Sequence, residues 1–448
     1  MSTAERAASD AEVLAVGRQI AANLPRSSSA ADRLDGRLLK TVAEDGELRA
    51  ALFRFTDVRP ACAGVRDLGA HLMTLLEEAD PSSRLGRALL LLARTPPTRP
   101  LTALAAGAGV QHLANRFIVG RTVQAALPAL GRGWESGVAA SVDLLGEASV
   151  SEEEAEAYVE RCLDALRALD AGSSGWPARP ALESDSLGPL PRANLSVKVT
   201  ALTPDIRLDA PRRGIDDAMA RLRRVLRLAA EVGAHVHIDM ETLDSRETVL
   251  GLVLELLAEP EFEAGPSSGL VLQAYLRDSP EELDEIIAWV GRHPRRVPLT
   301  VRLVKGAYWD HEVVEARAHG WEPPVFTQRA DSDRNFEELT RRLLDAHPRV
   351  RLALGSHNLR SIAHGLACLE SRGLQPRDLE LQVLRGLGDD LAHALSRMGL
   401  RVRSYSPVGD LLEGMAYLVR RMLENTANDS FLAARSRGAP LEELLAAP

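Results

Sequence analysis

Lysine and cysteine are scarce in this chain of 448 residues, and long apolar runs are missing. Only Lys40, Lys198 and Lys305 are lysine among 54 lysine and arginine residues. The three cysteines are far apart and lack a C-x-x-C spacing, which argues against a disulfide framework or a zinc site. No apolar stretch reaches the roughly 20 residues that span a bilayer, and the N-terminus lacks a signal-peptide pattern. These absences predict a cytoplasmic protein, with at most peripheral contact at the inner face of the membrane.

Positive charge is also in deficit. Acidic residues number 63, which gives a net charge of −9. Phosphate backbones bind to concentrated cationic patches, so this balance predicts no nucleic-acid partner. A hydrophobic content of 45% in a chain of this length is enough for a large buried core.

The apolar pattern divides the chain into parts. Residues 1–132 repeat apolar side chains at helical spacing, for example Leu48 and Leu52, without a strong alternating strand. Residues 133–432 instead show short apolar strands separated by amphipathic helices, which is typical of βαβ units. We therefore predict a helical N-terminal arm or α domain, an α/β barrel domain and, at 433–448, a C-terminal tail or linker.

Eight strand candidates each precede a helical pattern, which predicts a closed (βα)8 TIM barrel. An open doubly wound sheet is the alternative, but no Gly-x-Gly-x-x-Gly follows an early strand. The Gly-, Ser- and Pro-rich residues 171–191 are expected to form an exposed loop or insertion. The predicted strands cover residues 138–143, 195–200, 235–239, 269–275, 299–305, 351–355, 379–384 and 401–405.

Polar residues follow the predicted strands, and in a barrel all carboxyl ends meet at one rim. Lys198 and Asp239 are predicted to pair across it, either within a site or as a structural ion pair. His235 and His237 lack a third clustered ligand, so no metal site is expected there. Trp309 is expected in the core, its commoner place, or against an aromatic cofactor. The rim set comprises Asp143, Glu147, Lys198, Asp239, Glu241, Gln273, Tyr275, Arg302, Lys305, His357, Asn358, Gln382, Leu384 and Tyr405.

One late helix carries a polar stripe. Tyr417, Arg420, Arg421 and Glu424 are spaced three and four residues apart and share a face. Two neighbouring guanidinium groups suit a small carboxylate through charge-assisted hydrogen bonds. The alternative is a solvated face whose arginines pair with Glu424. Both interpretations stay open on the pattern alone.

Three segments closely resemble the signature segments of the FAD-dependent proline dehydrogenase family. They are Arg302-Leu-Val-Lys-Gly-Ala-Tyr-Trp-Asp310, Tyr405-Ser-Pro-Val-Gly409 and Tyr417-Leu-Val-Arg-Arg-Met-Leu-Glu-Asn425. The likeness extends over about residues 48–432, and its earlier part is similar to the proline dehydrogenase half of bifunctional proline utilisation A proteins. It implies a distorted (βα)8 barrel, noncovalent FAD and oxidation of L-proline to Δ1-pyrroline-5-carboxylate, the first step of proline catabolism.

The resemblance also implies residue roles. Arg420 and Arg421 would clamp the proline carboxylate with help from Lys198, and Glu147 would pair with Arg420 as a gate. The residues that would shape the proline pocket are Asp239, Ala307, Tyr308, Leu384, Tyr405 and Tyr417. Within the whole substrate-binding set, the predicted catalytic residues are Lys198, Asp239, Tyr405, Tyr417, Arg420 and Arg421. FAD would be held by Gln273, Arg302, Val304, Lys305, Gly306, Ala307, Trp309, His357, Asn358 and Glu424, with Arg302 beside flavin N5.

The family likeness predicts a membrane quinone as electron acceptor and a possible aldehyde dehydrogenase partner domain or protein, since that second domain is absent from this chain. Two other readings compete: a barrel flavoprotein resembling methylenetetrahydrofolate reductase, and a degenerate barrel that serves as a scaffold.

Overall fold

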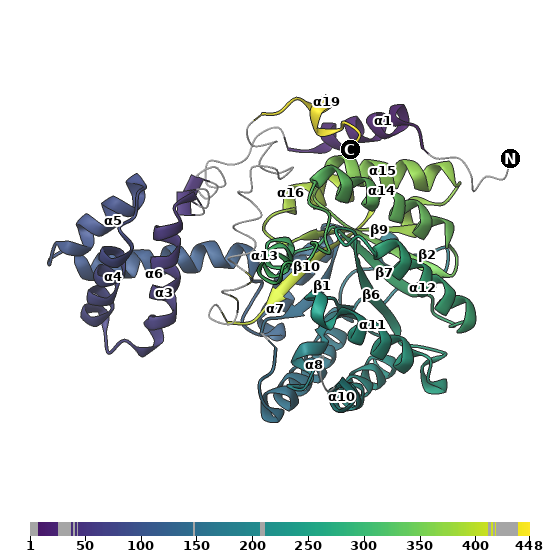
Figure 1. Cartoon of the computed structure of the whole chain (residues 1–448), viewed down its shortest axis with the longest axis horizontal. Coiled ribbons are helices and arrows are strands. Elements are labelled where there is room, and N and C mark those ends of the chain that lie inside the picture. Colours follow the sequence, from purple (N-terminus) through teal and green to yellow (C-terminus); the bar gives the residue numbers. More distant parts are fainter. Residues whose placement is uncertain are drawn as a thin grey trace. The chain divides into compact units, whose positions relative to one another are not determined.

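The computed structural model describes residues 8–25, 37–38, 41–42, 44–146, 148–206, 211–410, 414, 417 and 438–448. The chain divides into two compact units. The larger, here the barrel unit, comprises Met1–Leu24, Thr122–Val408 and Ala439–Pro448, and the smaller, here the helical unit, comprises Pro25–Arg121 and Gly409–Gly438 (Figure 1). The sequence-based boundaries at 132 and 432 remain a prediction.

The barrel unit is built on eight parallel strands that close on themselves in the order β1-β10-β9-β8-β7-β6-β5-β4. This confirms the predicted (βα)8 barrel, and the helices surround it (Figure 1). The strand interiors are almost wholly buried, which explains why the sequence reads as continuous apolar runs. The strands are β1 (Val138–Leu144), β4 (Asn194–Lys198), β5 (His235–Asp239), β6 (Ser267–Gln273), β7 (Leu299–Val304), β8 (Val350–Gly355), β9 (Leu379–Leu384) and β10 (Arg401–Val408).

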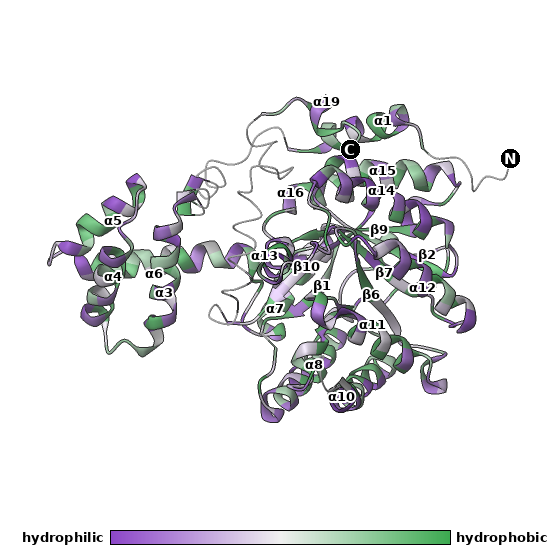
Figure 2. Ribbon diagram, viewed as in Figure 1, coloured by the Kyte–Doolittle hydropathy of each residue, from purple (hydrophilic) through white to green (hydrophobic). Residues whose placement is uncertain are grey.

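Local signals in the sequence set the helix ends. Ser151 caps α8 by accepting a hydrogen bond from the Glu154 backbone N–H. Three glutamates in the first turn interact favourably with the positive end of the helix dipole. Figure 2 shows hydrophobic and hydrophilic residues alternating around these helices, as packing on a barrel requires. The main helices of the unit are α1 (Asp10–Asn23), α7 (Val123–Glu135), α8 (Glu152–Ser173), α10 (Pro211–Glu231), α11 (Leu243–Leu257), α12 (Ser279–Arg292), α13 (Trp309–His319), α14 (Arg329–Asp345), α15 (Leu359–Ser371) and α16 (Asp389–Arg397).

A short hairpin closes the amino end of the barrel. Strands β2 (Ser184–Asp185) and β3 (Gly188–Pro189) pair antiparallel, and Asp185 is buried. Arg351 binds both Asp185 carboxylate oxygens at 2.8 and 3.0 Å, and Arg401 reaches one of them at 3.0 Å. The expectation that residues 171–191 form an exposed loop is therefore wrong at Asp185, because two buried arginines require a buried carboxylate.

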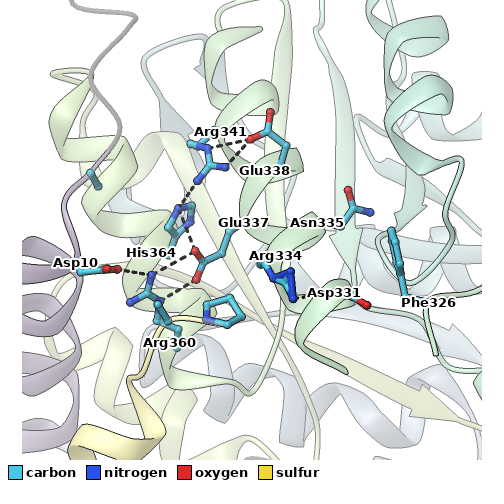
Figure 3. A pocket seen from close by; sticks show the side chains of 13 residues that line it. Asp10, Phe326, Asp331, Arg334, Asn335, Glu337, Glu338, Arg341, Arg360 and His364 are labelled. Atoms are coloured by element: carbon cyan, nitrogen blue, oxygen red, sulfur yellow. Dashed lines mark hydrogen bonds and ion pairs between the residues drawn. The ribbon is translucent and has the colours of Figure 1, made fainter. Parts of the chain in front are cut away.

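The two terminal segments of the barrel unit both contact α15. Buried Arg360 donates to Glu337 on α14 at 2.8 Å, to Asp10 on α1 at 2.8 Å and to the Leu445 carbonyl at 3.3 Å. Leu445 follows the short helix α19 (Leu441–Leu444) and packs against Gly17 of α1. A pocket of about 560 Å³ lies beside these contacts (Figure 3), and its lining includes none of the predicted site residues.

The helical unit confirms the predicted all-α N-terminal region. Its described core contains Phe55, Leu72 and Leu76, all fully buried. Asp45 caps α3 by accepting from the Leu48 N–H at 3.0 Å and also accepts from Ser83 N–H at 2.8 Å. No helix among the described residues is long and apolar enough to cross a membrane. The unit contains α3 (Gly46–Val58), η2 (Arg59–Ala61), α4 (Val65–Ala79), α5 (Arg84–Arg94) and α6 (Arg99–Phe117).

Candidate active site

Charged and polar side chains meet at the carboxyl ends of the barrel strands. Lys198, Asp239 and Gln273 are the last residues of β4, β5 and β6, and Lys198 is in register with Asp239. Arg302 and Tyr405 lie on β7, which pairs with β6, and on β10, which is separated from β4 by β1. Parallel strands end at one rim, so residues separated by about 200 positions share one site.

Asp239 is held by two donors from two other strands, β7 and β10. Arg302 Nη1 donates to Asp239 Oδ1 at 2.6 Å, and the Tyr405 hydroxyl donates to Oδ2 at 2.6 Å. The Arg302 guanidinium carbon lies 5.3 Å from the centre of the Tyr405 ring. Arg302 Nη2 also donates to the Ser196 hydroxyl at 3.2 Å. Both carboxylate oxygens are thus occupied, which fixes the position of the Tyr405 ring and the Arg302 guanidinium.

Lys198 pairs with Asp143 of β1, not with Asp239. Its Nζ donates to Asp143 Oδ1 and, at 3.3 Å, to the Leu144 carbonyl. The predicted Lys198–Asp239 pair is therefore wrong, although the charge of Asp239 still acts on Lys198. The reason is that Asp143 lies on the neighbouring strand β1 and is almost fully buried, so it requires a cation, whereas Asp239 already has Arg302.

The environment sets the protonation of the site. Burial alone would lower the pKa of Lys198, but the charges of Asp143 and Asp239 together raise it above its usual value. Burial raises the pKa of Asp143 more than the neighbouring ammonium lowers it. Burial and the two carboxylates also raise the pKa of Tyr405 well above its usual range. Lys198 and Tyr405 therefore remain hydrogen-bond donors at neutral pH.

The loop after β7 contains a glycine that the fold requires. Gly306 has a φ of +130°, and a side chain there would meet the ring of buried Tyr275 at 2.4 Å. Lys305 forms an ion pair with Asp333, and its Nζ lies 5.6 Å from the centre of the Phe336 ring. Burial lowers the pKa of Lys305 despite Asp333. Val304 ends β7, directly before these residues.

The other loop residues lie nearer to solvent. Trp309 is 39% exposed, and its indole N–H donates to the Phe326 carbonyl at 2.9 Å. The core position that Trp309 was expected to take is therefore wrong, because the residue begins α13 outside the strand. Tyr308 precedes that helix and is half-buried, and Ala307 is exposed.

The loop after β8 contacts the end of β9. The Leu384 backbone N–H donates to His357 Nε2 at 2.9 Å, so this nitrogen carries no proton. Asn358 caps α15 by accepting from the Ser361 N–H at 3.2 Å.

Tyr417 is described and buried but belongs to the helical unit. The remaining predicted residues, Glu147, Arg420, Arg421 and Glu424, lie outside the described residues.

Below the rim, the barrel interior contains polar pairs. His235 Nε2 lies 3.1 Å from His237 Nδ1, and His235 Nδ1 lies 2.8 Å from the Ser267 hydroxyl. Burial lowers the pKa of His235 to about 3 and lowers that of His237 well below its usual value. Both rings are neutral, and their partners are protein groups. They support the floor of the site and carry no charge to a ligand.

Asp143 belonged to the predicted rim set, whereas two further residues of the site, Asp333 and Tyr158, were not among the predicted site residues. Asp143 pairs with Lys198, Asp333 pairs with Lys305, and the Tyr158 hydroxyl accepts the Lys198 backbone N–H at 3.1 Å. Asp143 had a signal, since it lies near the end of a predicted strand. Tyr158 and Asp333 lie within amphipathic helices, where nothing in the pattern separates a site residue from an ordinary helix residue.

Comparisons with known proteins agree with this geometry. The family model for proline dehydrogenase matches residues 126–434, and the model for the proline utilization A N-terminal domain matches residues 10–117. Bifunctional protein PutA of Escherichia coli (strain K12) is 32% identical over 357 residues, which is 78% of this chain and 26% of that protein. Proline dehydrogenase 1 of Bacillus subtilis (strain 168) is 28% identical over 335 residues, which is 75% of this chain and 94% of that protein.

A solved structure is also similar over nearly the whole chain. It is proline utilization A from Bdellovibrio bacteriovorus inactivated by N-propargylglycine, with a TM-score of 0.86 and 34% identity. The match covers 97% of this chain and 44% of that one. The chain therefore spans less than half of that protein and about a quarter of the curated PutA relatives.

Proposed function

This chain belongs to the proline dehydrogenase family, and from that premise we propose that it oxidises L-proline to Δ1-pyrroline-5-carboxylate with FAD as hydride acceptor. The observation that carries the proposal is the rim of the barrel, where Lys198 and the Arg302–Asp239–Tyr405 group converge. The family match also argues against a methylenetetrahydrofolate reductase-like barrel. A degenerate scaffold is disfavoured because these charged groups are buried and mutually oriented, which a scaffold does not require.

The described residues fit an FAD site. Gln273 Oε1, at the end of β6, and Arg302 Nε, within β7, are buried and have no hydrogen-bond partner among the described residues. An acceptor and a donor of this kind suit the polar edge of a flavin ring. Gly306 has a φ of +130° and packs against the Tyr275 ring, so the next loop keeps a path that a larger residue would disturb. The residues proposed to hold FAD are Gln273, Arg302, Val304, Lys305, Gly306, Ala307, Trp309, His357, Asn358 and, outside the described residues, Glu424.

When bound, FAD supplies the two-electron acceptor that no amino-acid side chain provides. The chain itself binds and orients proline. The Lys198 ammonium has three N–H donors, and the structure assigns one to Asp143 and one to the Leu144 carbonyl. The third is proposed to bind the proline carboxylate together with Arg420 and Arg421. When two or three donors hold the proline carboxylate, the proline ring can take only one orientation. Hydride transfer from a ring carbon to FAD needs such a fixed orientation.

Asp239 and Tyr405 are proposed to form one wall of the proline pocket, and Arg302, a proposed FAD ligand, holds Asp239 in place. Their mutual hydrogen bonds hold the Tyr405 ring in one orientation, so the pocket has a fixed width. Ala307, Tyr308, Leu384 and Tyr417 are proposed to complete the wall, and Glu147 to close it by pairing with Arg420. Such a pocket excludes water, which strengthens the contacts to the carboxylate.

Anaerobic reduction tests the proposed function. The purified protein should be yellow, and L-proline should bleach the flavin absorbance and yield a product that o-aminobenzaldehyde traps. Replacing Arg421 by Met should raise KM for proline by orders of magnitude while FAD stays bound, because a buried charged contact is worth about 2 to 5 kcal/mol. A flavin that stays oxidised in excess proline would refute the activity. An unchanged KM in Arg421→Met would refute only the clamp.

Two finer points are proposed from the family likeness. A membrane quinone is the proposed final electron acceptor, which would place the protein at the inner face of the membrane as a peripheral protein. An aldehyde dehydrogenase, as a further domain or a separate protein, is the proposed consumer of the product. Reoxidation of the proline-reduced protein by a water-soluble quinone, faster than by oxygen, is the outcome that supports the first point.

A further inference from the structure

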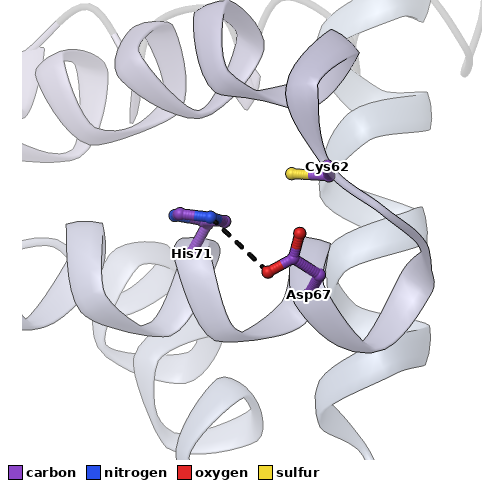
Figure 4. Close-up of side chains that lie close together, drawn as sticks. All are labelled: Cys62, Asp67 and His71. Atoms are coloured by element: carbon purple, nitrogen blue, oxygen red, sulfur yellow. Dashed lines mark ion pairs between the residues drawn. The ribbon is translucent and has the colours of Figure 1, made fainter.

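Cys62, Asp67 and His71 converge on the surface of the helical unit (Figure 4). The thiol sulfur, a carboxylate oxygen and an imidazole nitrogen lie within 4.8 Å of one another. His71 Nε2 lies 3.6 Å from Asp67 Oδ1. Cys62 follows η2, and Asp67 and His71 lie one turn apart on α4. The cluster therefore lies at the corner where the chain passes from α3 to α4, within one unit.

The fold orients each of the three groups. The spacing of four residues places Asp67 and His71 on one face of α4. The Ala63 backbone N–H donates to Asp67 Oδ2 at 2.9 Å, which holds the carboxylate and the residue after Cys62 together. The other oxygen, Oδ1, is left facing His71. A backbone hydrogen bond to one oxygen of a carboxylate is a common means of orienting a metal ligand.

We propose that Cys62, Asp67 and His71 bind a borderline divalent cation, represented by Zn²⁺. Thiolate, imidazole and carboxylate are the ligand types that Zn²⁺ uses in proteins, and three protein ligands leave a fourth position for water. The C-x4-D-x3-H spacing of these residues lacks the paired cysteines that usually mark a zinc site in a sequence. This site is independent of the proposed proline oxidation.

A second cysteine–histidine pair in the chain differs from this cluster in the charge of its surroundings. Cys368 Sγ lies 3.5 Å from His364 Nε2, but Arg341 Nη1 lies 3.3 Å from the same nitrogen, and the Glu337 carboxylate 3.7 Å from it is already paired with Arg360. A guanidinium in that place repels a cation. The third group at Cys62 and His71 is instead the carboxylate of Asp67, which attracts one.

Binding is a proton-for-metal exchange. The ordinary pKa of a cysteine thiol is about 8.5, so at neutral pH the sulfur carries a proton before the cation arrives. When the sulfur–metal bond forms, that proton passes to solvent, and no electron is transferred. The bound ion would connect the loop after η2 to the first two turns of α4. It would thereby stabilise the corner between α3 and α4.

Thiol labelling of the full chain tests the site. Cys62 is half-buried, whereas Cys162 and Cys368 are fully buried, so a disulfide reagent such as DTNB should label Cys62 first in the folded protein. After treatment with a chelator, added Zn²⁺ should slow this labelling by about tenfold or more. Added Co²⁺ should give a thiolate-to-metal charge-transfer band.

Variants separate a three-ligand site from a simple thiol contact. Asp67→Asn and His71→Gln should each abolish Zn²⁺ protection and the Co²⁺ band, with the far-UV circular dichroism unchanged. The matched control is His319→Gln, because His319 forms the same type of exposed pair with Glu315 at 3.5 Å. It should retain both signals. Unprotected Cys62 in the wild-type chain, or protection that persists in His71→Gln, would overturn the proposal.

Discussion

At the scale of single residues, the carboxylate of Asp239 is the best-defined group of the candidate site. Its oxygens accept one hydrogen bond each, from Arg302 and Tyr405, both at 2.6 Å. Hydrogen bonds to a charged group contribute about 1.5–3 kcal/mol each. Loss of either donor leaves a buried oxygen unsatisfied, so both donors should matter for the geometry of the pocket.

Tyr405→Phe removes one of these donors and keeps the ring. We expect kcat/KM for proline to fall roughly 10- to 100-fold, the equivalent of 1.5–3 kcal/mol, with FAD content unchanged. Steady-state kinetics with a flavin assay measure both. Ser404→Ala is the control on the same strand, because the Ser404 hydroxyl has no hydrogen-bond partner in the described part of the chain. Equal kcat/KM for Tyr405→Phe and wild type would contradict the role of Tyr405.

Glu282 makes the stability depend on pH. Burial raises the pKa of Glu282 from 4.5 to about 7, although Arg246 lies 3.4 Å away. An acid with a raised folded pKa stabilises the fold below its unfolded pKa, and this contribution is lost as the pH rises through the folded pKa. The free energy of unfolding of the wild type, relative to Glu282→Gln, should therefore fall between pH 4.5 and about 7.

Urea unfolding at several pH values measures this difference. Glu281→Gln, at the exposed neighbouring position, is the control and should follow the wild type at every pH. A difference between wild type and Glu282→Gln that stays constant over this range would show that folding does not raise the pKa of Glu282.

Residue pairing was the part of the site that sequence predicted least well. The strand ends placed Lys198, Asp239, Arg302 and Tyr405 at one rim, and the structure brings them there. The predicted partner of Lys198, Asp239, was nevertheless wrong, since Lys198 pairs with Asp143. Which carboxylate a flexible ammonium reaches depends on the stagger of the barrel and on the burial of Asp143, and neither is a property of the local sequence.

At the scale of elements, the eight strands were predictable because each is a short apolar run bounded by turn residues. The observed β5 and β9 coincide with the predicted residues 235–239 and 379–384. The hairpin that carries Asp185 was missed, since its two-residue strands are too short to show a period. Its burial depends on arginines that lie far along the chain.

The loop between β7 and α13 depends on one glycine. Gly306→Ala would place a Cβ 2.4 Å from the Tyr275 ring at a φ of +130°, so the loop must shift. Because this loop carries several proposed FAD ligands, we expect Kd for FAD to rise at least about tenfold, or 1.4 kcal/mol. Quenching of flavin fluorescence on titration measures Kd. Gly251→Ala, in an open helical position of α11, should leave it unchanged.

At the scale of the whole molecule, Arg360 joins three separate segments of the barrel unit. Arg360→Met removes the contacts to Asp10, Glu337 and the Leu445 carbonyl. A buried Glu337 without its partner should lower the free energy of unfolding by about 3 kcal/mol. Hydrogen exchange should accelerate in α1 and α19.

A surface pair between the same two segments provides the control. Arg18 and Glu442 lie 3.8 Å apart with largely exposed side chains, and exposed pairs contribute at most about 1 kcal/mol. Arg18→Ala should leave exchange in α1 close to that of the wild type. If hydrogen exchange in α1 accelerates equally in Arg360→Met and Arg18→Ala, the removal of any charge near α1 destabilises it. The buried contact of Arg360 would then have no special role.

The position of the two terminal segments also permits a circular permutant of the chain. Ala8 and Pro448 line the same pocket, so a linker of a few residues could join them without displacing α15. The polypeptide could then be opened at a surface loop between two barrel helices, to give a circular permutant with an intact barrel. In such a permutant, α1 and α19 would become one continuous internal segment, and a sensor domain could be attached at the newly opened loop.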